Sequence, residues 1–118
     1  MSPKENVIQT KSFTFALKII KLSKQLQEAS EFIISKQLLR SGTSIGANVE
    51  EALAGQSLKD FISKMAIASK EARETRYWLR LLQASQTVKG DFSELLRDVD
   101  EIKRILTSIV KTSSEKRK

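Results

Sequence analysis

The sequence predicts an all-α protein that folds as an antiparallel, up-down-up-down four-helix bundle. The only proline is Pro3, the 118 residues include just four glycines, and β-branched residues do not alternate with polar ones over the length of a strand. Apolar residues instead recur at steps of three and four, the spacing of one helix face. A chain of this length can bury one core, so we expect a single domain spanning residues 1–118.

The periodicity predicts four helices, at about residues 12–29, 30–54, 58–84 and 91–111. The first helix could begin at "SPKE", where Ser2, Pro3 and Glu5 make a plausible cap, or nearer Ser12. We prefer the later start, because Val7 and Ile8 do not continue the apolar pattern of this helix well. The first ten residues are then expected to be extended.

Capping motifs mark the starts of the third and fourth helices. In "SLKD", Ser57 and Asp60 form a capping box. In "DFSE", Asp91 can cap the helix, and the Glu94 side chain can accept a hydrogen bond from the Asp91 backbone in return. Residues 113–118 are polar and basic, so we expect a frayed tail. Connections this short force successive helices to lie antiparallel.

Composition argues against several classes of function. The chain has no cysteine and no histidine, which removes thiolate chemistry, the commonest general base near neutral pH and the commonest metal ligand. We therefore expect no enzymatic activity, no catalytic or metal-binding residues, no cofactor and no small-molecule substrate. No apolar run approaches the roughly 20 residues that span a bilayer, and "MSPKEN" has no secretory apolar segment. A cytoplasmic protein without a membrane partner is expected.

The charge balance is basic and makes RNA or DNA a candidate partner. The chain carries 21 Lys and Arg against 14 Asp and Glu, a formal net charge of +7, which is compatible with binding to phosphates. The candidate nucleic-acid contacts lie on the first and third helices: Lys18, Lys21, Lys24, Lys64, Lys70, Arg73, Arg76 and Arg80.

The first and third helices carry more apolar surface than one bundle core can cover, which favours self-association. The only tryptophan and the only tyrosine are adjacent on the face of the third helix turned away from the predicted core, and such residues are enriched at interfaces. The candidate interface residues are Phe15, Leu22, Gly42, Gly46, Ile67, Tyr77, Trp78 and Leu81.

The segment "LLRSGTSIGANVEEA", residues 38–52, combines two glycines with a polar stripe. Glycine costs about 1 kcal/mol in a helix interior relative to alanine, so close approach of another helix must offset it. On one flank a polar stripe falls within about 80° on a helical wheel. Two glutamates of the third helix could join this stripe. The candidate polar network is Arg40, Ser44, Asn48, Glu51, Glu71 and Glu74. It could be an inter-helix or inter-subunit network, a solvated face or a ligand site.

The motifs "RSGTSIGANVEEA", "SLKDFISKMAIASKEARET" and "YWLRLL" resemble the bacterial four-helix-bundle proteins encoded in intervening sequences of 23S rRNA genes. The matching positions span residues 37–82, and Ala52 and Glu71 depart from the residues that many members carry. The resemblance implies an antiparallel bundle that assembles as a homopentamer. It also implies kinship with the basic accessory variability determinant proteins of retroelements, which assist a reverse transcriptase and bind nucleic acid.

Two functions stay open at this point. The first is a non-enzymatic, oligomeric accessory factor that binds RNA or DNA through its basic surfaces. The alternative is a homo-oligomeric scaffold that binds a protein partner and no nucleic acid, with its charges serving solubility.

Overall fold

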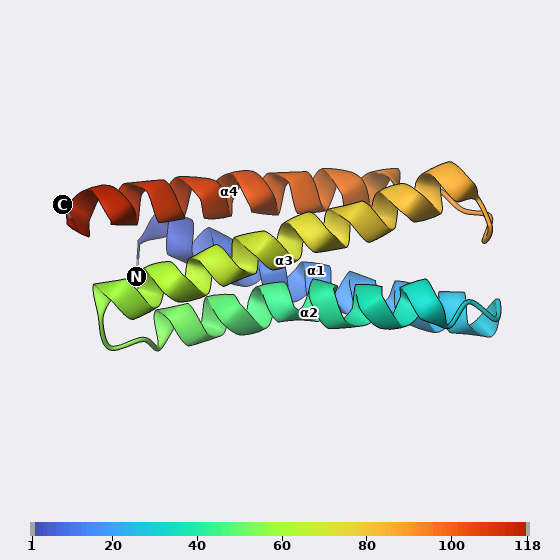
Figure 1. Cartoon of the computed structure of the whole chain (residues 1–118), viewed down its shortest axis with the longest axis horizontal. Coiled ribbons are helices and arrows are strands. Elements are labelled where there is room, and N and C mark those ends of the chain that lie inside the picture. Colours follow the sequence, from blue (N-terminus) through green and yellow to red (C-terminus); the bar gives the residue numbers. More distant parts are fainter. Residues whose placement is uncertain (1, 118) are drawn as a thin grey trace.

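A computed structural model, which describes residues 2–117, contains four long α-helices and, within those residues, no strand (Figure 1). The helices pack side by side into a rod of 48 × 21 × 20 Å. The predicted all-α, four-helix fold is confirmed. The helices are α1 (Pro3–Glu28), α2 (Ile33–Leu53), α3 (Leu58–Ser85) and α4 (Ser93–Arg117).

Contacts between helices fix their directions and order. Gln9 and Ser23 of α1 form hydrogen bonds with Glu50 and Ser35 of α2, respectively, so these two helices run in opposite directions. Each helix packs on the next, α4 packs back on α1, and α1 and α3 lie on a diagonal of the bundle, where their backbones do not approach closely. Figure 1 shows the same up-and-down path, with both termini at one end of the rod.

The start of α1 corrects the prediction near Ser12. The helix begins at Pro3, and the Ser2 hydroxyl and the Glu5 carboxylate accept hydrogen bonds from each other's backbone N–H groups, which makes the capping box. Ile8 is fully buried, on the same stripe as Ser12 and Phe15. The pattern was obscured because a serine occupies a core-facing position, which interrupts the apolar periodicity.

The start of α2 also differs slightly from the prediction at Ser30. Ser30 adopts a left-handed backbone with φ of 63°, which ends α1 rather than beginning α2. Helix α2 starts at Ile33, and its N-cap residue Phe32 makes no side-chain cap. The Glu31 carboxylate instead accepts a 2.7 Å hydrogen bond from the Ser35 N–H, satisfying a donor of the first turn.

The C-terminal end corrects the prediction of a frayed tail. Helix α4 begins after Asp91, whose carboxylate accepts from the Ser93 N–H at 2.9 Å, and continues to Arg117. Ser113 is buried on the same stripe as Leu106 and Ile109, so the packed face extends beyond the predicted end near Lys111. Only Lys118 of the predicted tail lies outside the described residues.

The core is a single apolar cluster along the bundle axis, to which every helix contributes. Within it, the Thr75 hydroxyl of α3 donates to the Glu71 carbonyl of its own helix and lies at hydrogen-bond distance, 2.9 Å, from the Ser41 hydroxyl of α2. These bonds satisfy the buried hydroxyl groups where α2 and α3 pack. Among the described residues, no helix combines the length and the apolar character needed to cross a bilayer.

Candidate functional site

Four residues form an exposed stripe along the outer face of α3, at steps of three, four and three. Lys70, Arg73 and Arg80 supply positive charge, and Tyr77, whose side chain is 51% exposed, lies between the two arginines. Within residues 2–117 none of the three cations has an ion-pair partner. Arg73 makes only a 3.4 Å hydrogen bond to Ser69. We call Lys70, Arg73, Tyr77 and Arg80 the α3 basic stripe.

Two of the cations predicted to contact phosphate, Lys18 and Arg76, instead form ion pairs with another helix of the bundle. The Lys18 ammonium of α1 lies 2.8 Å from Asp98 and 3.0 Å from Glu94 on α4. Hydrogen bonds from Lys18 to Asp98 and Glu94 raise the pKa of Lys18 above its ordinary value of 10.5. Arg76 pairs with Asp100 at 2.7 Å. These cations bridge neighbouring helices, so they are poor candidates for binding a phosphate.

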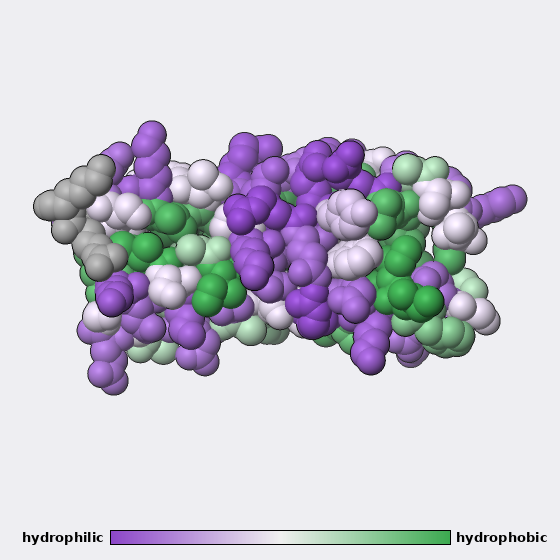
Figure 2. Space-filling view, viewed as in Figure 1, coloured by the Kyte–Doolittle hydropathy of each residue, from purple (hydrophilic) through white to green (hydrophobic). Residues whose placement is uncertain are grey.

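The remaining predicted contacts lie away from the α3 basic stripe. Lys21 and Lys24 are exposed on α1, on the opposite diagonal of the bundle. Lys64 is half-buried on α3 and is not on the stripe. Figure 2 shows that hydrophilic residues form a band across the middle of the face that α3 crosses, between two hydrophobic patches. The sequence therefore grouped cations that the fold distributes over different faces.

The polar network joins α2 to α3 at one point. Arg40 bonds to Glu71 at 3.2 Å and pairs with Glu74, and Glu74 also accepts a 3.1 Å hydrogen bond from the Trp78 indole N–H. The indole was not in the predicted network, although its spacing of four residues from Glu74 is that of helix neighbours. Glu71 is only 14% exposed, so Arg40 compensates a carboxylate that has little access to water.

The other three predicted members do not join this cluster. The Asn48 amide donates to the Ser44 carbonyl at 2.9 Å within α2, and Glu51 is exposed and makes no side-chain hydrogen bond or ion pair among the described residues. The stripe on α2 is therefore part inter-helix contact and part solvated face. Across the described residues, no group of three or more Asp or Glu side chains is arranged to hold a metal ion.

We predict that Arg40→Ala lowers the free energy of unfolding by about 1 kcal/mol, because the pair is half-exposed and exposed ion pairs contribute little. Glu74 would lose its arginine partner, so the environment of the Trp78 indole should change as well. Urea unfolding followed by Trp78 fluorescence measures both effects. Lys36→Ala, an exposed change on the same helix, is the control, and equal behaviour of the two variants would contradict the network.

The exposed apolar surface of α1 differs from the predicted interface. Phe15 is only 2% exposed, and with Leu22 it lies in the core, so neither can contact a second copy while the bundle is folded. Phe13, by contrast, is 61% exposed, and Leu17 and Ile20 continue its stripe at steps of four and three. The sequence showed a broad apolar arc on this helix, but not which of its two edges faced outward.

The two glycines also face inward rather than toward a partner subunit. A Cβ atom on Gly42 would lie 2.8 Å from Ile19 Cγ2, and one on Gly46 would lie 3.4 Å from the Ser12 carbonyl oxygen. Both glycines thus let α2 approach α1 within the same chain, which corrects their assignment to an oligomer interface. Close packing between the two helices offsets the propensity cost of the glycines.

The remaining predicted interface residues lie on α3. Ile67 and Tyr77 are exposed, whereas Trp78 and Leu81 are half-buried. The Tyr77 and Trp78 rings pack edge to face with centroids 5.4 Å apart. The Trp78 ring also packs against the core and donates to Glu74, so only part of its surface could serve an interface.

Comparison with known proteins gives a family and a structural relative. Residues 4–108 match the family described as 23S rRNA-intervening sequence protein. A crystal structure of a protein of unknown function from the S23 ribosomal protein family of Bacteroides thetaiotaomicron VPI-5482 is 49% identical in sequence. The match covers 92% of this chain and 98% of that one, with a TM-score of 0.87. No curated protein matches the sequence. The chain therefore belongs to the 23S rRNA-intervening sequence protein family.

Proposed function

We propose that this protein is a non-enzymatic, self-associating bundle of the cytoplasm that binds RNA or DNA through the α3 basic stripe. The observation that carries the proposal is the exposed line of Lys70, Arg73 and Arg80, whose charges have no ion-pair partner among the described residues, in contrast to Lys18 and Arg76. Cations that are not engaged within the protein are the ones that can replace the counterions of a phosphate backbone.

The chemistry of the stripe favours binding with little reading of sequence. Lysine and arginine on a helix surface contact phosphates, which position a nucleic acid without identifying its bases. Three such contacts in one copy give a slope of about −3 in log K against log salt concentration for duplex DNA. Tyr77, between Arg73 and Arg80, adds a ring face against which an unpaired base can stack.

Self-association would multiply this charge, and the exposed apolar residues of α1 support it. Phe13, Leu17 and Ile20 form a continuous apolar stripe on the surface of one copy, and burying such a stripe against another copy gains roughly 25 cal/mol per Å² of apolar area. We propose a homo-oligomer, with the homopentamer that the resemblance implies as the expected assembly. Several copies would then present their α3 basic stripes to one nucleic acid, which raises avidity.

Charge reversal on the stripe tests the nucleic-acid proposal. We expect Arg73→Glu with Arg80→Glu to weaken binding to structured RNA and duplex DNA at least tenfold, since two attractions become repulsions. Fluorescence anisotropy over a range of salt concentrations measures the affinity and its salt slope. Lys21→Glu with Lys24→Glu is the matched control, because it changes the net charge by the same amount on the opposite diagonal of the bundle.

Three results would overturn this assignment. No binding by the unchanged protein at low salt removes the function. A larger loss in the control pair than in the stripe pair moves the site to α1, and equal losses show that net charge alone determines binding. Light scattering on both double variants establishes that the assembly is unchanged, so that a loss of affinity cannot be attributed to dissociation.

A scaffold function is the second candidate, and the same apolar stripe favours it. If Phe13, Leu17 and Ile20 cover a protein partner rather than a second copy, the charges serve solubility. Such a partner should survive a pull-down at high salt, which disrupts phosphate contacts but strengthens apolar burial. Loss of every co-purified protein at high salt would exclude this function.

A further inference from the structure

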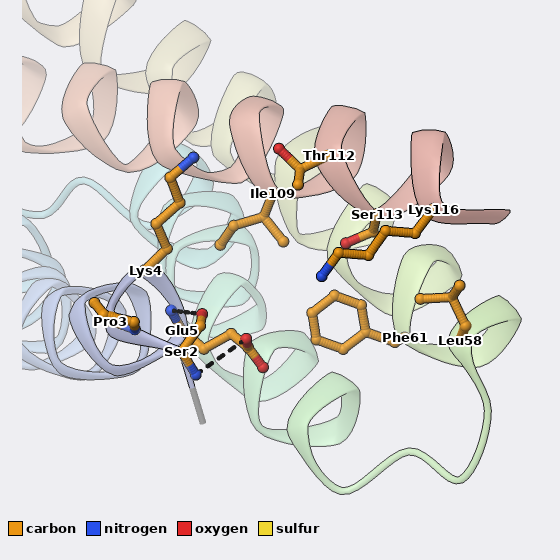
Figure 3. A pocket seen from close by; sticks show the side chains of 10 residues that line it. All are labelled: Ser2, Pro3, Lys4, Glu5, Leu58, Phe61, Ile109, Thr112, Ser113 and Lys116. Atoms are coloured by element: carbon orange, nitrogen blue, oxygen red, sulfur yellow. Dashed lines mark hydrogen bonds between the residues drawn. The ribbon is translucent and has the colours of Figure 1, made fainter. Parts of the chain in front are cut away.

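A hollow opens at the end of the bundle where α1 and α3 begin and α4 ends (Figure 3). Its volume of about 580 Å³ lies in the range of sites for small molecules. Most of the wall is apolar and comes from Pro3, Leu58, Phe61 and Ile109. Leu58 is among the exposed large apolar residues, so part of this wall is open to water. An apolar wall of this kind suits a hydrocarbon group.

Two hydroxyl groups on the wall, those of Thr112 and Ser113, make no hydrogen bond among the described residues, and of these two residues only Ser113 is buried. Ser113 is 7% exposed, its hydroxyl points into the hollow, and it makes no hydrogen bond within the part of the chain that the structure describes (Figure 3). Thr107, six residues earlier on α4, instead donates to the Lys103 carbonyl of its own helix at 2.9 Å. No buried side-chain oxygen or nitrogen of the described residues lacks a partner, so the Ser113 oxygen faces the open hollow, where water can reach it. Ser113 therefore offers a donor to whatever occupies the hollow.

The charges around the hollow favour an anion. The ammonium group of Lys116 extends over the opening in Figure 3, and no ion-pair partner is found for it among residues 2–117. The other two charged side chains are engaged: Lys4 donates to the Ser108 hydroxyl at 2.6 Å, and Glu5 accepts from the N–H of Ser2 in the cap. The helix dipoles add no net charge here, because the C-terminal ends of α2 and α4 lie at this end together with the N-terminal ends of α1 and α3.

We propose that this hollow binds a small amphiphilic carboxylate, with its hydrocarbon chain against Phe61 and Ile109 and its carboxylate on Ser113 and Lys116. One hydroxyl donor and one ammonium match the two oxygens and single charge of a carboxylate. A phosphate dianion would require more donors than the hollow supplies, and a neutral hydrocarbon would leave the serine unpaired. The site is separate from the α3 basic stripe, so it does not depend on nucleic-acid binding.

An NMR titration of the ¹⁵N-labelled protein with decanoate, kept below its micelle concentration, tests the site. We expect amide shifts confined to the starts of α1 and α3 and the end of α4. Decylammonium has the same chain and the opposite charge, and it should bind at least tenfold more weakly. Ser113→Ala and Lys116→Glu should each weaken decanoate about tenfold. Lys111→Glu, an equal charge change on α4 outside the hollow, should have little effect.

Several outcomes would overturn the proposal. They are the absence of shifts with millimolar decanoate, equal binding of decylammonium, and shifts centred on the apolar stripe of Phe13, Leu17 and Ile20. An equal effect of Lys111→Glu and Lys116→Glu would show that decanoate responds only to net charge. Because Ser113→Ala replaces a helical serine with a better helix former, a loss of binding in that variant reports the hydroxyl rather than unfolding.

Discussion

A Gly42→Val variant is expected to lose about 2 to 3 kcal/mol of its free energy of unfolding, although valine is a better helix former than glycine. A Cβ atom at this position would lie 2.8 Å from Cγ2 and 2.9 Å from Cγ1 of Ile19. Ile19 is fully buried and its β-branched side chain has little rotamer freedom in a helix, so it cannot move aside. Helices α1 and α2 would have to separate, and the overpacking cost exceeds the gain in helix propensity.

Gly46→Ala is the matched control on the same face of α2. Its Cβ atom would lie 3.4 Å from the nearest atom, the Ser12 carbonyl oxygen, which is ordinary van der Waals contact. Removing a glycine from a helix interior should then raise stability by about 0.5 to 1 kcal/mol. Urea unfolding followed by far-ultraviolet circular dichroism measures both changes. If Gly42→Val were as stable as Gly46→Ala, the close approach of α1 and α2 would be contradicted.

These glycines show how much of the fold the sequence could predict. Their spacing indicated close approach of a second helix, and that inference holds. The identity of the neighbour did not follow, because a helical wheel specifies the face of one helix and not what packs on it. The two glycines contact α1 of the same chain at Ile19 and Ser12, whereas the sequence had also assigned them to a contact between subunits.

Element boundaries were predictable where capping residues and periodicity agreed. At the start of α3 they agreed, and the Ser57 hydroxyl accepts from the Asp60 N–H at 3.0 Å. They disagreed at the two ends of the chain, because buried serines at positions 12 and 113 occupy core-facing sites. A polar residue on a packed helix face interrupts the apolar periodicity, so counting apolar residues does not reveal that the face is buried. The caps of α1 were the better guide there.

The candidate site was less predictable than the fold, because ion pairs depend on the register between helices. The partners of Lys18 on α4 are 76 and 80 residues away along the chain, and nothing local indicates them. Only the folded bundle shows which cations are held in ion pairs and which can bind a phosphate. The same holds for Phe13 and Phe15, since which edge of an apolar arc faces the core is decided by the neighbouring helices.

Phe15→Ala is expected to destabilise the bundle by about 3 to 5 kcal/mol, the cost of emptying a buried phenylalanine site in a core. Phe15 is only 2% exposed and belongs to the core cluster, so the surrounding side chains could collapse only in part onto the cavity. Many domains have a total stability of 5 to 15 kcal/mol, so this variant should unfold at much lower urea concentration or fail to fold. Urea unfolding followed by circular dichroism, at the same concentration for the variant and the unchanged protein, measures the loss.

Phe13→Ala should behave in the opposite way. This side chain is 61% exposed, so its removal should change the stability of a single copy by about 0.5 kcal/mol or less. If the stripe of Phe13, Leu17 and Ile20 covers a second copy, the variant should dissociate at higher concentration than the unchanged protein. Sedimentation velocity over a range of concentrations measures this, together with urea unfolding at each concentration, because the stability of an oligomer depends on concentration. An unchanged assembly would exclude Phe13 from the interface, and strong unfolding would contradict its exposed position.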